Sequence, residues 1–133
     1  ECEGKEVDLE TLEYIHLHKT GALLKACVRT GAMIAGANEK LLQALTTYAE
    51  GIGLAFQIID DILDLTSSSE KLGKTAGKDL LADKTTYPKL LGMEESKKRA
   101  FDLVAKAKKA IEPWGEDAKY LISLADFITN RDR

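Results

Sequence analysis

The sequence is poor in cysteine, and it has no long uninterrupted apolar run. Its two cysteines, Cys2 and Cys27, are too few for a disulfide framework or a metal-binding cysteine cluster, so we expect reduced thiols in an intracellular protein. No apolar run approaches the roughly 18 residues of a membrane-spanning helix, so none is expected. A net charge of -3 offers no general attraction for nucleic acid or for an anionic membrane.

Proline is also scarce, and strand-like alternation of apolar and polar residues is lacking. The two prolines are Pro88 and Pro113. Apolar residues recur almost throughout at the three-to-four-residue spacing of helices. With 133 residues, of which 44% are hydrophobic, the chain can form one compact core. The sequence therefore predicts an all-α chain with no internal repeat and no domain linker.

Caps and breakers set the expected helix boundaries. Asn38 is a candidate N-cap for a long second helix, the run Thr66-Ser67-Ser68-Ser69 is expected to end it, and Asp117 is a candidate cap for the last helix. Gly21 and Gly31 weaken the first helix, which close packing between helices would explain. The expected helices cover residues 8–36, 39–65, a short piece before Gly92, 94–111 and 118–129, with a polar loop at 70–79.

A stripe of carboxylates runs along an otherwise apolar part of the second helix. Residues 52–65 are apolar nearly all round, which is typical of a helix at the centre of a bundle. Gln57, Asp60, Asp61 and Asp64 share one face of that helix. Ionised carboxylates at this spacing repel one another, and no lysine or arginine lies between residues 48 and 65 to offset them.

Three outcomes are open for these carboxylates: protonation, pairing with distant cations, or binding of a metal ion. Oxygen ligands of this kind suit a hard ion such as Mg²⁺, which is commonly shared with substrate phosphates. A solvated acidic edge on a surface helix is the alternative. The apolar surroundings argue against that alternative, because a surface helix should not be apolar on its remaining faces.

A loop rich in lysine and glycine follows the acidic stripe. Residues 71–79 contain three lysines, including Lys74, and two glycines. Glycines let backbone amides approach an anion, and lysines supply mobile positive charge. The loop lacks P-loop spacing and would, taken alone, be a solvated loop. Its position beside the carboxylates indicates a site for a metal-bridged polyphosphate.

Histidines and a lysine mark the first helix. His16 and His18 are two residues apart and so face different sides, which makes them a poor pair of metal ligands. Lys19 follows in an apolar stretch, where it either extends to the surface or reaches into a cavity. The sequence leaves both possibilities open.

Three segments together resemble the trans-prenyl diphosphate synthases. FQIIDDILD (residues 56–64) resembles the second aspartate-rich motif of that family, and HKTGALL (residues 18–24) resembles its Lys-Thr motif. GKTAGKD (residues 73–79) and DKTTYP (residues 83–88) resemble its lysine loop and the segment after it. The segments occur in the family's order, and the whole run is most similar to plant-type geranylgeranyl diphosphate synthases.

The resemblance implies a fold and a reaction. The fold would be the isoprenoid synthase helical bundle, of which residues 1–133 would form a single partial domain, the C-terminal half. The enzyme would be a prenyltransferase in which Mg²⁺ assists ionisation of an allylic diphosphate. The resulting carbocation would then alkylate isopentenyl diphosphate.

The resemblance also implies roles for individual residues. Asp60 would be the principal Mg²⁺ ligand, while Asp61 and Asp64 would hold its waters or assist directly. The remaining positions would bind the allylic diphosphate or surround the developing cation. These are Lys19, Lys74 and Lys84 for the diphosphate, and the Thr20 backbone oxygen, Gln57 and Phe56 for the cation.

The family's first aspartate-rich motif has no counterpart in this sequence. We therefore expect the N-terminal half of the bundle to be absent from these 133 residues. The chain should then expose apolar helix faces, and on its own it should be inactive as a prenyltransferase. Another chain or the missing half would complete the site, within a homodimer or heteromer that resides in a plastid if the plant-like resemblance holds. The alternatives are a non-catalytic partner subunit of a heteromeric synthase and a fragment of a helical terpene cyclase.

Overall fold

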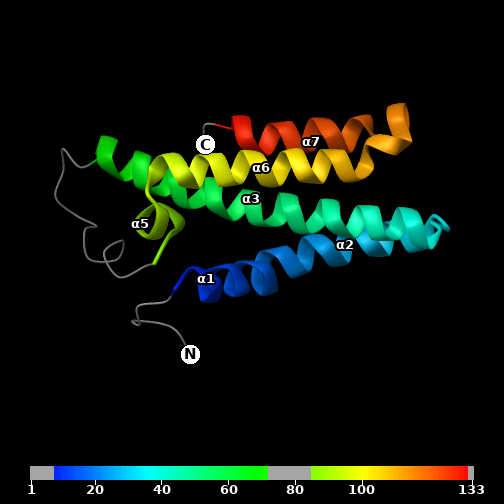
Figure 1. Ribbon diagram of the computed structural model, residues 1–133, viewed down its shortest axis with the longest axis horizontal. Helices are drawn as coiled ribbons and strands as arrows, with labels where there is room; N and C mark the ends of the chain where they lie inside the picture. The colour runs from blue at the N-terminus through cyan, green and yellow to red at the C-terminus, as the bar shows by residue number, and fades with distance from the viewer. Residues whose placement is uncertain (1–7, 72–84, 132–133) are drawn as a thin grey trace.

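The chain folds into helices arranged around one long central helix. The computed structural model describes residues 8–71 and 85–131, and within these ranges it contains helices and no strand (Figure 1). The central helix is α3 (Glu39–Lys71), and it contacts every other α-helix in the described residues. The α1–α2 segment lies along one side of α3, and α6 and α7 lie along the other (Figure 1). The all-α fold class expected from the sequence is confirmed.

The first segment is one continuous rod with a widened turn in its middle. It consists of α1 (Leu9–His16), a π-helical turn η1 (Leu17–Gly21) and α2 (Ala22–Ile34). Asp8 caps its start by accepting a hydrogen bond from the Thr11 amide at 2.8 Å. The expected span is thus confirmed, but the spacing of apolar residues gave no sign of the π-helical turn, which falls on the Lys-Thr motif.

The central helix begins where the sequence predicts and ends later. Asn38 accepts a hydrogen bond from the Leu41 amide at 2.9 Å, as expected of an N-cap. The predicted break at residues 66–69 is wrong, because α3 continues to Lys71. The Thr66 hydroxyl donates back to the carbonyls of Ile62 and Leu63 at 3.1 Å. Hydroxyls that bond back in this way are compatible with a continuing helix.

The second half of the chain forms two antiparallel helices and a short one. The short helix is α5 (Tyr87–Leu91), α6 (Met93–Ile111) follows it, and a 3₁₀ helix η2 (Glu112–Ala118) leads into α7 (Lys119–Asn130). The Pro113–Gly115 stop is confirmed. The predicted Asp117 cap is wrong: Ala118 is the N-cap and no side chain caps α7, because the 3₁₀ helix runs directly into it.

Small residues let the helices approach α3 closely. A Cβ atom on Gly51 would lie 3.1 Å from Ala107 Cβ on α6, and one on Gly53 would lie 3.1 Å from Gly21 Cα in η1. Close packing between helices therefore explains Gly53, whereas a Cβ on Gly21 would meet only its own segment, with the His16 carbonyl oxygen at 3.3 Å. Close packing does not explain Gly31, where an added Cβ would meet nothing within 4 Å.

A buried tyrosine ties the central helix to the last one. Tyr48 on α3 is fully buried, and its hydroxyl donates to the Leu121 carbonyl on α7 at 2.7 Å. Burial raises the pKa of the Tyr48 phenol to about 12, because the charged phenolate is disfavoured away from water.

The outer layers retain exposed apolar side chains. Leu23 and Ile34 on α2 are 67% and 83% exposed, and Phe127 on α7 is 64% exposed. Apolar surface on both outer layers agrees with the expectation of an incomplete bundle. None of the helices in the described part of the chain combines the length and apolar character that crossing a membrane requires.

We predict that a large side chain is far more damaging at Gly53 than at Gly31. In Gly53→Leu the new side chain would meet the backbone of Gly21, and the free energy of unfolding should fall by about 1–3 kcal/mol. In Gly31→Leu nothing obstructs the side chain, and helix propensity should raise stability by up to about 1 kcal/mol. Urea unfolding measures the free energy of unfolding of both variants. Equal changes in that free energy would contradict the packing of η1 on α3.

Tyr48 should make stability depend on alkaline pH. Its pKa is about 12 when folded and about 10 when unfolded, so its stabilising effect is complete below pH 10 and is lost as pH rises from 10 to 12. Tyr48→Phe should therefore cost about 1 kcal/mol at pH 8 and less at pH 11.5. Urea unfolding at both pH values tests this, with Tyr120→Phe, at an exposed position, as the control. A Tyr48→Phe deficit that is equal at the two pH values would contradict it.

Candidate functional site

The predicted carboxylate stripe lies on α3, but its members occupy different environments. The Asp60 side chain is 49% exposed and Asp64 is exposed, whereas Gln57 is half-buried. Asp61 is only 2% exposed. Adjacent residues on a helix point about 100° apart, so Asp60 and Asp61 face different neighbours.

An arginine from the far end of the described chain pairs with Asp60. Arg131 Nη2 lies 3.1 Å from Asp60 Oδ1 and also donates to the Phe56 carbonyl at 3.1 Å. Its guanidinium carbon is 4.0 Å from the centre of the Phe56 ring, in a cation–π arrangement. The side chain of Arg131 is only 11% exposed. Pairing with a distant cation, one of the three open outcomes, is therefore realised at Asp60.

Asp61 belongs to a buried cluster formed by three elements. Its Oδ2 accepts a hydrogen bond from the Tyr87 amide at the start of α5, at 3.2 Å. The same oxygen lies 3.5 Å from Nε2 of His16, at the end of α1. The His16 and Tyr87 rings stack with their centroids 5.7 Å apart and their planes 15° apart. The sequence pattern predicted no role for His16 and indicated only that it is an unsuitable metal ligand.

The Tyr87 phenol is buried next to an ion pair that joins α1 to α6. Burial raises the pKa of this phenol, the Glu13 carboxylate raises it further, and the Arg99 guanidinium opposes both. Glu13 and Arg99 form a salt bridge with each other. The DKTTYP resemblance includes Tyr87, so the sequence could have placed this residue near the site, but it offered no sign of its partners.

The Lys-Thr motif forms the π-helical turn η1 and packs on the same helix as the carboxylates. Lys19 is exposed and Thr20 is half-buried. Of the two positions considered for Lys19, the structure therefore shows the surface one. His16 is buried while His18 is exposed and bonds back to the Tyr14 carbonyl, so the two rings face different sides as expected. Lys74 and Lys84 lie outside the described residues.

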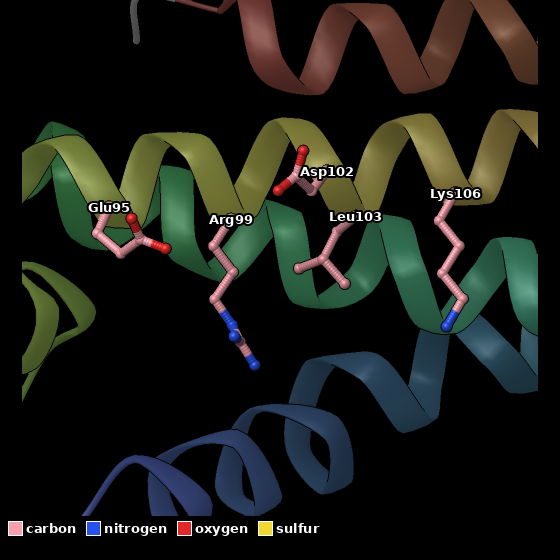
Figure 2. Close-up of a pocket in the computed structure, with 5 residues that line it drawn as sticks. All are labelled: Glu95, Arg99, Asp102, Leu103 and Lys106. Carbon is pink, nitrogen blue, oxygen red and sulfur yellow. The ribbon is translucent and has the colours of Figure 1, made fainter.

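A shallow hollow of about 240 Å³ lies elsewhere, along α6. It is lined by Glu95, Arg99, Asp102, Leu103 and Lys106, so it contains two acidic and two basic side chains. Figure 2 shows Arg99 and Lys106 extending from α6 toward the α1–α2 side. None of the predicted site residues lines this hollow, and the Arg99 guanidinium is already paired with Glu13.

The carboxylates fit a magnesium ion only as a pair. Asp60 and Asp64 are one helical turn apart with exposed oxygens, and Mg²⁺ is commonly held by one or two carboxylates with waters and phosphates completing its shell. Asp61 is buried and turned toward His16. No group of three or more His, Cys, Asp or Glu side chains in residues 8–71 and 85–131 is placed to hold a metal ion.

Comparison with known sequences places the chain in one protein family. Residues 1–121 match the polyprenyl synthetase family. The chain is 56% identical over 131 residues to a geranylgeranyl diphosphate synthase of Cyanophora paradoxa, covering 98% of this chain and 44% of that protein. It is 53% identical over 133 residues to the chloroplastic geranylgeranyl pyrophosphate synthase of Capsicum annuum, covering 98% and 36%. It therefore spans less than half the length of these relatives.

Solved structures show the same fold. A protein of Marinomonas sp. MED121 superposes with a TM-score of 0.81 at 40% identity, over 97% of this chain and 43% of that one. The geranyltransferase of Helicobacter pylori, solved with magnesium and isoprenyl diphosphate, superposes with a TM-score of 0.72 at 29% identity, over 97% and 42%. The helical architecture and the sequence match agree, and the chain belongs to the polyprenyl synthetase family.

Proposed function

We propose that this chain is the C-terminal part of a prenyl diphosphate synthase that joins isopentenyl diphosphate to an allylic diphosphate. The observation that carries the proposal is the packing of the Lys-Thr turn against the helix that holds the exposed carboxylates Asp60 and Asp64, within a polyprenyl synthetase. The names of the relatives support it. Because the chain spans less than half of their length, it would act together with an N-terminal part.

Binding of the allylic diphosphate would fall to the lysines. Lys19, Lys74 and Lys84 would contact its phosphate oxygens and stabilise the charge that develops as the allylic C–O bond breaks. An ammonium group suits this role because it is a compact positive charge on a flexible stem. The exposed position of Lys19 on η1 leaves it able to reach an anion from the surface of α3.

The allylic carbocation would be surrounded by apolar and weakly polar groups. The Thr20 backbone oxygen and Gln57 would face it, and the Phe56 ring would line the cavity. None of these groups is a nucleophile strong enough to trap the cation. The electron pair of the isopentenyl double bond would then form the new C–C bond, and loss of a proton from the adjacent carbon would restore a double bond.

Asp60 and Asp64 would hold Mg²⁺ at this site. When bound, Mg²⁺ supplies charge neutralisation to the leaving diphosphate. Arg131 lies 3.1 Å from Asp60 and offsets its negative charge in the present structure. The magnesium in the Helicobacter pylori structure supports the choice of ion.

The partners and the location follow from the same proposal. The exposed apolar side chains on α2 and α7 support packing against further helices, from the N-terminal half or from another chain in a homodimer or heteromer. The chloroplastic relative from Capsicum annuum supports residence in a plastid.

Asp60→Ala should abolish prenyl transfer by the complete synthase that contains this chain. We expect turnover with Mg²⁺, isopentenyl diphosphate and an allylic diphosphate to fall by at least about 100-fold, because charge stabilisation of the leaving group is lost. Product analysis by mass spectrometry measures this, with the assayed species identified by intact mass. Asp102→Ala, an exposed carboxylate on α6, is the matched control and should leave turnover unchanged.

Three results would contradict the proposal in different ways. Undiminished turnover in Asp60→Ala would exclude the carboxylate role. A folded complete protein that forms no product but changes the activity of a separate synthase would indicate a partner subunit. Cyclic products formed without isopentenyl diphosphate would indicate a terpene cyclase.

A further inference from the structure

Three polar or aromatic side chains from three separate elements meet at one buried point. His16 at the end of α1 is 6% exposed, Asp61 on α3 is 2% exposed, and Tyr87 at the start of α5 is fully buried. Asp61 Oδ2 receives the Tyr87 amide at 3.2 Å and faces His16 Nε2 at 3.5 Å. His16 Nε2 is buried and makes no hydrogen bond within the described residues, and the Asp61 carboxylate lies within ion-pair distance of it.

A carboxylate is costly to bury, so its position has to be supported by its neighbours. A magnesium ligand also needs room for the waters that the ion retains. Asp60 and Asp64 have that room, because their side chains reach solvent. The Asp61 carboxylate is instead enclosed by the imidazole and the α5 backbone, on the side of α3 that faces α1.

The cluster sits at one end of the π-helical turn that carries the Lys-Thr motif. His16 is the residue immediately before η1, and Gly21 is its last residue. Gly21 lies so close to Gly53 that a Cβ added to Gly53 would be 3.1 Å from the Cα of Gly21. The turn is thus held on α3 at both ends, by the His16–Asp61 contact and by the Gly21–Gly53 contact.

Holding both ends matters because π-helical turns are rare and short. If the extra residue of the turn were lost to an ordinary α-helix, every side chain beyond it would rotate by about 100° relative to α3. Such a rotation would change the direction in which Lys19 and Thr20 leave the turn relative to α3. The contact at His16 opposes such a rotation from one end of the turn, and Leu17 within the turn packs against the core.

We propose that His16 and Asp61 form a positioning pair that fixes the Lys-Thr turn on α3, and that Asp61 acts through this pair and is not a cation ligand. The proposal rests on the proposed function, since it assigns how that same site is held together. It separates two adjacent aspartates of one motif: Asp60 faces the ion and the diphosphate, and Asp61 faces the scaffold.

The test compares matched variants in the complete synthase that contains this chain. Asp61→Asn keeps an oxygen for the Tyr87 amide but removes the charge that faces His16, and Asp60→Asn makes the same change one residue earlier. Binding of Mn²⁺ as a substitute ion and Mn²⁺-dependent binding of inorganic diphosphate are measured by calorimetry. Asp60→Asn should weaken Mn²⁺ binding at least about 10-fold, whereas Asp61→Asn should leave it within about twofold and weaken diphosphate binding about 10-fold.

Variants of His16 test the pairing itself. His16→Phe keeps a ring against Tyr87 but removes the nitrogen, and it should weaken diphosphate binding about as much as Asp61→Asn does. The double variant should be no worse than either single one, because both changes act on the same contact. His16→Gln retains a side-chain N–H that can reach Asp61, so it should recover most of the loss and serves if His16→Phe folds poorly.

Loss of Mn²⁺ binding in Asp61→Asn equal to that in Asp60→Asn would overturn the proposal and leave the proposed function standing. Additive effects of His16→Phe and Asp61→Asn would also overturn it, because independent losses mean no shared contact. Unchanged Mn²⁺ binding in Asp60→Asn would instead contradict the ion site of the proposed function. In that case additivity or non-additivity between His16 and Asp61 still decides whether the pair exists.

Discussion

The architecture depends on the burial of α3, because a helix enclosed on most sides can carry ionised groups only where other elements supply partners. Each carboxylate on such a helix needs a cation, an N–H donor or an opening to water. Asp60 has the Arg131 guanidinium and partial exposure, Asp61 has the Tyr87 amide and His16, and Asp64 reaches solvent. These requirements bring the last described residue, the first helix and the short helix α5 to one stretch of α3.

The burial of α3 also constrains how closely the neighbouring helices pack against it. The α3 backbone can be shared by α2, α6 and η1 only because small residues mark the crossings. Gly51 faces Ala107 on α6, and Gly53 faces Gly21 in η1. A glycine inside a helix lowers its intrinsic stability by about 1 kcal/mol relative to alanine, a cost that the closer packing offsets. The Lys-Thr turn can pack directly on the helix that carries the carboxylates because these crossings are tight.

The sequence predicts the helices well and the partners of the site poorly, for a physical reason. Apolar periodicity and caps are local, so the Asn38 cap and the stop at Pro113 could be located from neighbouring residues alone. The break expected at Thr66 was wrong, since a hydroxyl can either compete with the helix or bond back to it, and only the fold decides. The Arg131–Asp60 pair joins residues 71 positions apart, and no local pattern encodes such a contact.

Adjacent aspartates of one motif show why a sequence motif alone does not determine the role of each residue. Asp60 and Asp61 have the same side chain, the same helix and consecutive positions, yet a rotation of about 100° separates a half-exposed carboxylate from a buried one. A carboxylate that reaches solvent has space beside it for an ion and its waters. Asp61 instead directs its Oδ2 atom toward the Tyr87 amide and the His16 ring. The chemistry of each therefore follows from the element packed against it, and α1, α5 and the Arg131 end of the chain determine it here.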